Sequence, residues 1–245
     1  MIPVSDHGKP SPSPAFLATL ANRSASLLVK LVMTFVARIY VVRGENAGRL
    51  GAFVLASNHI SHFDPPILSS VVRRKIDWMA MAEFFPHPVL GRFLRAVDAF
   101  PADRHRADRA TIRTALERLK RGRIVGIFPE GGIRDGVRSV IEGAPLRPGA
   151  SALAHLARVP VLPCVIVGPD RFYAGKSWLP LRRTPVWIAF GEPISNHPEL
   201  GKDAARERIE RELADAFQKL YAELREKFSL TDSDLPQSPR QRSGA

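Results

Sequence analysis

The sequence contains a single cysteine, Cys164, among its 245 residues. One cysteine excludes a disulfide framework and a cysteine-based zinc site within one chain. Because Cys164 lies in the apolar run Val161–Val167, and free cysteine is often buried, we predict that it is a buried strand residue. The chain is long enough for one α/β domain with a substantial core.

Long apolar runs are also missing. A membrane-spanning helix needs roughly 20 mostly apolar residues, and no stretch of the sequence meets this requirement without interruption. The nearest candidate, residues 15–42, is interrupted by Lys30 and Arg38. A spanning helix stays open but is less favoured than two other interpretations: a helix in the membrane interface with its cations at the headgroups, or a helix that covers the protein's own core. We expect residues 15–44 to form an apolar helical segment that associates with a membrane, peripheral or shallowly inserted.

The two ends of the chain lack regular apolar patterning. Residues 1–14, rich in serine and proline, are expected to be disordered. They show no charged-then-apolar pattern with a small-residue cleavage site, so we predict no signal peptide. Residues 229–245, rich in serine, proline, glutamine and arginine, are expected to be a disordered tail.

Acidic residues are outnumbered, with 24 Asp and Glu against 36 Lys and Arg and a net charge of +12. Such a balance suits nucleic acid, anionic lipid or phosphorylated substrates. The sequence holds no base-reading motif or nucleic-acid-binding module, so we expect no nucleic-acid partner. Two alternatives from other classes stay open: binding of nucleic acid by charge alone, and a basic protein without catalytic activity that coats anionic membranes.

Short apolar runs alternate with amphipathic stretches through most of the chain. The runs predict strands at Phe53–Ala56, Ile76–Met81, Val97–Phe100, Ile124–Phe128, Val161–Val167 and Val186–Phe190. Helices are predicted at Pro66–Val72, Pro88–Arg95, Ala107–Arg121 and Ala150–Ala157, followed by a long amphipathic helix at Lys202–Phe228. The alternation predicts an α/β fold over residues 45–228, with a mainly parallel sheet covered by helices.

One strand–loop–helix segment carries the clearest chemistry. An apolar run ends at Ala56, and the loop that follows contains His59 and Asp64. Asp64 followed by Pro65 predicts a helix start, with Asp64 at the N-cap and Pro65 at the first helical position. On a continuous helix the two side chains would face apart, whereas in a loop they can meet. A carboxylate in contact with an imidazole orients it as a general base, so we predict a His59–Asp64 pair.

This segment resembles the first motif of the glycerolipid acyltransferase family: Asn58 and His59, four further residues, and Asp64. The family's second motif, an apolar strand that ends in an arginine, is similar to the stretch that ends at Arg104. The resemblance implies that Arg104 helps to bind the phosphate of the acyl acceptor. A guanidinium suits this role because it can hold two phosphate oxygens at once.

A second strong feature is Phe-Pro-Glu-Gly at the end of a predicted strand, which is similar to the family's third motif. Glu130 and Gly131 match that motif. Gly132 stands where threonine is usual, Ile133 stands where arginine is usual, and Arg134 comes one position late. The resemblance implies that Glu130 receives the acceptor's hydroxyl or orients an arginine, and that Gly131 lets backbone N–H groups approach the acceptor.

Two later stretches complete the pattern. Arg147–Ala150 resembles a Lys-Pro-Gly-Ala segment that follows the third motif, although an ordinary turn into a helix explains it equally well. Val159–Pro163 resembles the fourth motif, a strand that carries proline. The four motifs stand in the family's order between Phe53 and Val167, and together they identify the chain as a member of the family.

The resemblance implies O-acyl transfer from an acyl thioester to the hydroxyl of 1-acyl-sn-glycerol 3-phosphate, giving phosphatidate. His59 would act as the base and Asp64 would orient it, while N–H groups near the loop are candidate donors to the oxyanion. The acceptor would be held by Asn58, Arg104, Glu130, Gly131 and Arg134. No metal or cofactor is implied, and the donor stays open between acyl-CoA and an acyl carrier protein. Anionic lipid at the cytoplasmic face of the cell membrane is the expected surface.

Other chemistries fit the segment less well. His62 with His59 and Asp64 would make a three-ligand metal site, but no further ligand pattern supports it. Ser61 lacks the Gly-x-Ser-x-Gly setting of a nucleophilic serine, so direct transfer is favoured. Within the family, the altered third motif keeps another lysolipid or polar-lipid hydroxyl open as the acceptor.

Overall fold

The computed structural model describes residues 24, 27–28, 31–33, 35–96, 99–102, 109–179 and 183–243, without the side chains of residues 93, 96, 239 and 243. The predicted phosphate ligand Arg104 and the stretch expected to be disordered, 1–14, lie outside these residues, as do the first two residues of the strand predicted at Val97–Phe100.

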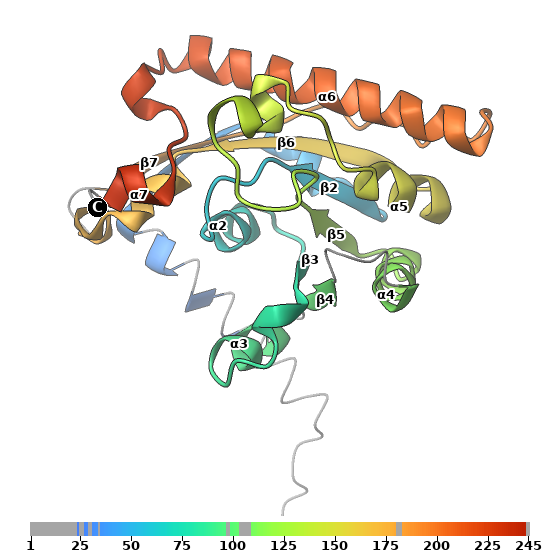
Figure 1. Cartoon of the computed structure of the whole chain (residues 1–245), viewed down its shortest axis with the longest axis horizontal. Coiled ribbons are helices and arrows are strands. Elements are labelled where there is room, and N and C mark those ends of the chain that lie inside the picture. The colour runs from blue at the N-terminus through green and yellow to red at the C-terminus, as the bar shows by residue number, and fades with distance from the viewer. Residues whose placement is uncertain are drawn as a thin grey trace, which may run out of the picture.

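A seven-stranded sheet forms the centre of the molecule (Figure 1). Its order is β1-β7-β6-β2-β5-β3-β4, and every neighbouring pair is parallel except β6 with β7. The mainly parallel sheet is therefore confirmed. The strands are β1 (Ala37–Val42), β2 (Phe53–Ser57), β3 (Ile76–Met81), β4 (Phe100–Ala102), β5 (Ile124–Ile127), β6 (Val161–Val167) and β7 (Thr184–Phe190).

Helices cover both faces of this sheet. They are α2 (Asp64–Val71), α3 (Leu90–Ala96), α4 (Arg109–Lys120), α5 (Gly149–Ala157), α6 (Lys202–Lys227) and α7 (Pro239–Ser243). Short 3-10 helices are η1 (Gly44–Gly48), η2 (Ala82–Phe84), η3 (Gly136–Arg138), η4 (Val140–Glu142), η5 (Pro169–Tyr173), η6 (Gly175–Trp178) and η7 (Asp232–Asp234).

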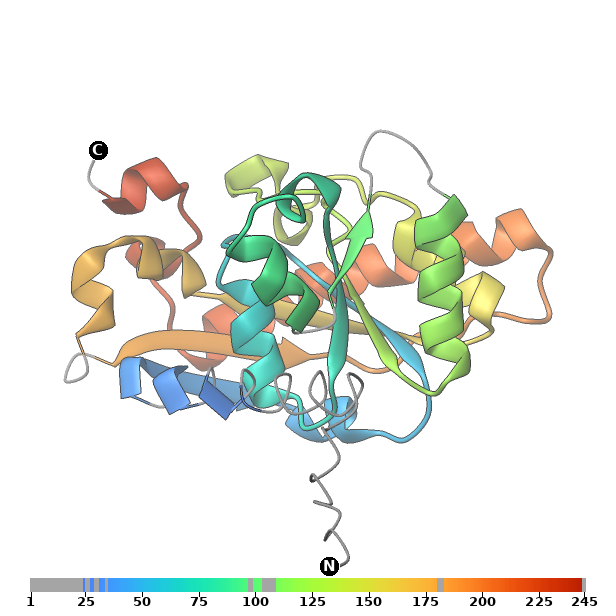
Figure 2. The ribbon, with the colours of Figure 1, turned by 90° about the horizontal axis from the view of Figure 1, so that it is seen from below.

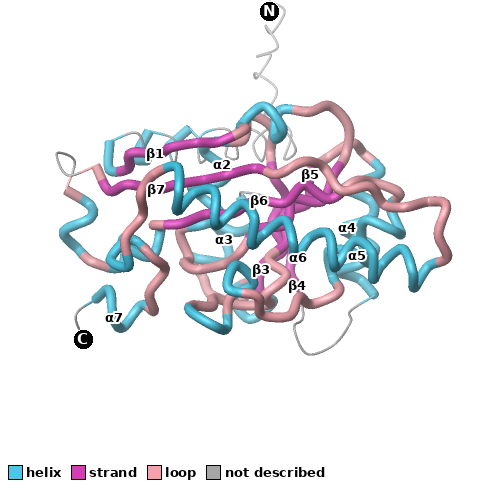
Figure 3. The backbone as a smooth tube through the Cα atoms, turned by 90° about the horizontal axis from the view of Figure 1, so that it is seen from above, coloured by secondary structure: helices cyan, strands magenta, loops and turns pink. Residues whose placement is uncertain are grey.

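The two cores follow from the alternation of side chains along each strand. Val54 and Ala56 of β2 face the core under α4, α5 and α6, and α6 crosses that face (Figure 3). Phe53 and Leu55 face the opposite core, which is covered by α2 and by helical residues before β1 (Figure 2). Runs of apolar residues in the central strands are expected when helices cover both faces of a parallel sheet.

The segment expected to be helical over residues 15–44 is only partly so. Its described residues between 24 and 36 are helical, but Ala37–Val42 forms strand β1, which pairs in parallel with β7. Pairing with a strand nearly 150 residues away completes the edge of the sheet, and local apolar content cannot show that. In the part of the chain that the structure describes, no helix is long and apolar enough to cross a membrane.

The segment expected to be a disordered tail is also structured. Within residues 229–243 the chain forms η7 and α7, which lie beside η5, the 3-10 helix that follows β6 (Figure 1). Ion pairs to distant residues hold them, among them Arg242 to the buried Asp170 at 2.6 Å. Composition predicted disorder because it records the lack of apolar residues but not these long-range partners.

Candidate active site

The loops that carry the predicted site meet at one edge of the sheet. Strands β2 and β5 are parallel neighbours, with Ala56 opposite Ile127. The loop after β2 contains His59 and Asp64, and the turn after β5 contains Glu130 and Gly131. Because carboxyl ends of parallel strands lie at the same edge, the first and third motifs come together there.

The predicted pair is present. His59 Nδ1 lies 2.8 Å from Asp64 Oδ2, and the same oxygen accepts hydrogen bonds from the N–H groups of Ile60 at 2.8 Å and Ser61 at 2.9 Å. Asp64 is fully buried. The loop is therefore wrapped around one carboxylate, and with Nδ1 engaged, Nε2 is the ring nitrogen that can accept a proton.

The helix start differs from the prediction in one detail. Helix α2 begins at Asp64 itself, Phe63 takes the N-cap position, and Pro65 is the second helical residue. Asp64 makes no conventional cap because its carboxylate turns back into the loop instead of bonding to the first turn of the helix.

An aromatic stack fixes the face of the imidazole. The His59 ring lies on Phe128, with 4.0 Å between centroids and 16° between planes, and Phe128 lies on Trp78 at 4.9 Å and 7°. The indole N–H of Trp78 donates to Ser69 Oγ at 2.9 Å. A Cβ at Gly126 would lie 2.5 Å from the Trp78 ring, so glycine leaves room for the stack. The ring of His59 is thus held at one edge by Asp64 and on one face by Phe128.

Glu130 supports the backbone of the same histidine. Its carboxylate accepts hydrogen bonds from the N–H of His59, from Ser139 Oγ at 2.5 Å and from the N–H of Val140 at 2.9 Å. The side chain is buried, and burial raises the pKa of Glu130 to about 7 although these three donors favour the charged form.

The turn after Glu130 brings two arginines beside the loop. Gly131 has φ +65°, a conformation that favours glycine, and a Cβ there would lie 2.6 Å from Arg147 Cζ, so a larger residue would have to displace the Arg147 side chain. The N–H of Arg147 donates to Pro129 O at 2.8 Å, and the N–H of Arg134 donates to His59 O at 2.8 Å. The sequence is compatible with Arg147 as a turn residue or as a ligand, and in the structure its side chain lies against Gly131 of the third motif.

A sequence model of the family described as Acyltransferase matches residues 38–167, just over half of the chain and the whole of this site. This chain belongs to the acyltransferase family. A similar protein is the 1-acyl-sn-glycerol-3-phosphate acyltransferase of Bacillus subtilis, 30% identical over 167 residues that span 68% of this chain and 78% of that protein.

A further relative and a solved structure are also similar to this chain. The 1-acyl-sn-glycerol-3-phosphate acyltransferase of Streptococcus pneumoniae is 25% identical over 71% of this chain and 62% of that protein. The crystal structure of the 1-acyl-sn-glycerophosphate acyltransferase PlsC from Thermotoga maritima has a TM-score of 0.59 at 22% identity, covering 85% of this chain and 87% of that one. The similarity to the Thermotoga maritima structure shows a shared fold.

Two residues of this acyltransferase have contacts that differ from the expected ones. Asn58 is fully buried, its side-chain N–H donates to Ile166 O at 3.0 Å, and its Oδ1 accepts from the N–H of Ile166 at 2.8 Å. It therefore ties the loop to β6 and does not face a substrate. The buried Glu130, expected at the acceptor's hydroxyl or an arginine, instead holds the backbone of His59 and the η3–η4 turn.

Backbone N–H groups of the loop are engaged inside the protein. The five from His59 to Phe63 donate in turn to Glu130, to Asp64 twice, to the Tyr173 hydroxyl and to Ser61 Oγ. In this conformation these five groups are therefore engaged within the protein and are not free to donate to an oxyanion. Ser61 is buried and its hydroxyl oxygen lies within the turn, as a structural residue would.

His62 turns away from the His59–Asp64 pair. Its Nδ1 lies 2.6 Å from the hydroxyl of Tyr173. Among the residues that the structure describes, no three His, Cys, Asp or Glu side chains are grouped so that they could hold a metal ion.

Arg104 follows β4, whose last residue, Ala102, lies opposite Met81 of the parallel strand β3. The end of β4 is thus on the same edge of the sheet as the loops of His59 and Glu130. Arg104 comes two residues later and lies outside the described residues, so its contact with a phosphate stays a prediction.

Proposed function

We propose that this acyltransferase moves a fatty acyl group from an acyl thioester to the free hydroxyl of 1-acyl-sn-glycerol 3-phosphate, which gives phosphatidate. The observation that carries the proposal is the His59–Asp64 pair, with its imidazole held on an edge and a face inside the region that matches the family. The names of the relatives from B. subtilis and S. pneumoniae support this acceptor.

The proposed reaction needs one base and no covalent enzyme intermediate. His59 Nε2 takes the proton of the acceptor hydroxyl while the oxygen attacks the thioester carbonyl. The tetrahedral intermediate collapses, the C–S bond breaks, and the imidazolium returns the proton to the leaving thiolate. Asp64 keeps the hydrogen on Nδ1 and stabilises the imidazolium, because its carboxylate is already fixed by the N–H groups of Ile60 and Ser61.

The acceptor's phosphate requires cations near this base. Arg134 and Arg147 flank the turn after β5, and Arg104 follows β4 at the same edge of the sheet. Bidentate guanidinium contacts suit a phosphate, and a guanidinium near the thioester can also stabilise the oxyanion now that the loop N–H groups are engaged. We assign these three arginines to the acceptor.

Lipid substrates favour a protein that works at a membrane surface. Leu27, Leu28, Leu31 and Phe35 in the helical segment before β1 are each more than half exposed, while Met33 and Val36 pack into the core. An apolar outer face combined with a net charge of +12 supports peripheral association with anionic lipid at the cytoplasmic face of the membrane. The donor stays open between acyl-CoA and an acyl carrier protein.

One observation favours a second acceptor. Gly132 and Ile133 replace the threonine and arginine of the usual third motif, so the turn offers fewer groups to a phosphate. Thioester consumption with a panel of lysolipid acceptors, with the lipid product identified, tests the proposal. Turnover with 1-acyl-sn-glycerol 3-phosphate that is lost in His59→Ala supports it, whereas turnover with a different lysolipid alone would replace the acceptor and keep the mechanism.

A further inference from the structure

Tyr173 contacts the outer side of the loop that carries the base. Its hydroxyl accepts a hydrogen bond from the N–H of His62 at 3.1 Å and lies 2.6 Å from His62 Nδ1. The neighbouring Phe63 packs edge-on against Phe172 and Trp178, with centroids 5.8 and 5.3 Å apart. Ile60 and Ser61 bind Asp64 through their N–H groups. His62 and Phe63 instead contact η5 and η6, through Tyr173, Phe172 and Trp178.

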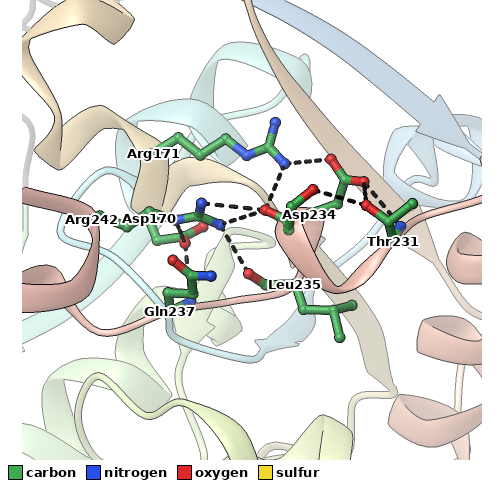
Figure 4. A network of polar contacts seen from close by, with 8 residues as sticks. Asp170, Arg171, Thr231, Asp234, Leu235, Gln237 and Arg242 are labelled. Carbon is green, nitrogen blue, oxygen red and sulfur yellow. Dashed lines mark hydrogen bonds and ion pairs between the residues drawn. The ribbon is translucent and has the colours of Figure 1, made fainter.

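The C-terminal segment in turn holds η5 (Figure 4). Asp170 is fully buried, and its Oδ2 accepts from Arg242 Nε at 2.6 Å and from the N–H of Gln237 at 3.0 Å. Arg171 Nη2 donates to Asp234 Oδ1 at 2.5 Å. Two consecutive residues of η5 are thus anchored to the segment that follows α6, three and two positions before Tyr173.

That segment has its own internal structure, so it can serve as an anchor. Thr231 and Asp234 form a capping box, with the N–H and the hydroxyl of Thr231 donating to Asp234 Oδ2 at 2.9 and 2.7 Å. Arg242 also donates to Leu235 O at 2.9 Å. These contacts hold Asp234 and Arg242 in position for their ion pairs with Arg171 and Asp170.

We propose that Tyr173 is a positioning residue for acyl transfer, and that residues 231–243 clamp it against His62 through Asp170 and Arg171. The proposal rests on the proposed function for its substrate. In it, Tyr173 contacts no reacting atom. Its hydroxyl keeps the His62–Phe63 part of the loop in place, so that His59 meets the acceptor hydroxyl at the right distance and angle, and small displacements of catalytic groups reduce turnover strongly.

The test compares Tyr173→Phe with Tyr40→Phe. The first variant keeps the ring beside Phe63 and removes the hydroxyl. The second is a matched control, because Tyr40 stacks on Trp187 in β1 and β7, away from the loop. Loss of two hydrogen bonds predicts a fall in kcat of about tenfold for Tyr173→Phe, with both KM values nearly unchanged. Tyr40→Phe should leave kcat within about twofold of wild type.

A double-mutant cycle tests the clamp. Arg242→Ala should lower kcat by a similar factor in the wild-type background and by much less in Tyr173→Phe, because the two act through one contact. Arg211→Ala, which removes an exposed arginine from the outer face of α6, is the control. Independent effects of Arg242→Ala and Tyr173→Phe would overturn the clamp. Wild-type kcat in Tyr173→Phe, or a raised KM at unchanged kcat, would overturn positioning.

Hydrogen exchange of the peptide that contains residues 60–63 separates this proposal from the proposed function. Tyr173→Phe should speed exchange there by about tenfold, and Tyr40→Phe should not, whichever acceptor the enzyme uses. If wild type transfers acyl groups to none of the lysolipids, the proposed function fails, while faster exchange still supports the contact. Unchanged exchange in the 60–63 peptide together with unchanged kcat refutes the proposal that Tyr173 positions the loop.

Discussion

Asp64 and Glu130 are two buried carboxylates that hold the same histidine in different ways. Asp64 takes its three contacts from residues within five positions of itself: His59 Nδ1 and the N–H groups of Ile60 and Ser61. Glu130 reaches the N–H of His59 across 71 positions and takes its other hydrogen bonds from Ser139 and Val140. One carboxylate therefore sets the chemistry of the ring, and the other sets the position of the backbone that carries it.

The largest expected effect comes from breaking the first of these contacts. Asp64→Asn should lower kcat by about 10³–10⁴-fold with a much smaller change in acceptor KM, because an amide no longer favours the tautomer with hydrogen on Nδ1. His59→Ala should abolish transfer. Steady-state kinetics, with circular dichroism to verify the fold, provide the measurement. A folded His59→Ala variant with near-wild-type turnover would falsify the base assignment.

Glu130→Gln should have its main effect on stability and its pH dependence. The folded pKa of Glu130 is about 7 and the ordinary value is 4.5, so the native state binds the extra proton between these values. The unfolding free energy of wild type should therefore fall, relative to Glu130→Gln, as the pH rises from 4.5 to 7, by ~3 kcal/mol. Denaturant unfolding at pH 4.5, 6 and 8 measures it. A difference between the two proteins that stays constant with pH contradicts the assignment.

Arg104, which follows β4 at the same edge of the sheet, extends the comparison to the acceptor. Arg104→Ala should lower kcat/KM for the acceptor by about ten- to more than a hundredfold, mainly through KM, because a charge-assisted hydrogen bond to phosphate is lost. Arg104→Lys should recover part of it, since a point charge lacks the bidentate fork. A raised thioester KM with an unchanged acceptor KM would move Arg104 to the donor's phosphates. Arg147→Ala, tested in parallel, shows whether the arginine over Gly131 shares this role.

The smallest expected effect concerns the backbone of that turn. Gly131→Ala should destabilise the protein by about 1–3 kcal/mol, because it combines a positive φ with a Cβ that runs into Arg147. Gly136→Ala is a matched control, since Gly136 has φ +52° but a Cβ there would have open space. It should cost only the conformational part, about 1 kcal/mol. Equal losses of stability in the two variants, measured by thermal unfolding, would mean that Arg147 yields without cost.

What the sequence determined by itself is local or periodic. Apolar spacing predicted β2, β3, β5, β6 and β7 to within two residues at each end, and the long helix α6 to within one residue. The strand predicted at Val97–Phe100 was misplaced, because β4 begins at Phe100 and ends at Ala102. The meeting of His59 with Asp64 was predictable because only four loop residues separate them, and Glu130 was predictable as a strand-end residue because the run before it ends there.

Only the tertiary structure decided contacts between distant parts of the chain. Asn58 forms hydrogen bonds with Ile166, 108 positions away, and is therefore structural. Arg242 pairs with Asp170, 72 positions away, and this contact orders a segment whose composition predicts disorder. Ala37–Val42 forms a strand because it pairs in parallel with β7 at the edge of the sheet. In each case the stabilising partner lies far away in the sequence. A local sequence pattern does not predict which distant residue will become the partner, because the fold of the whole chain determines that contact.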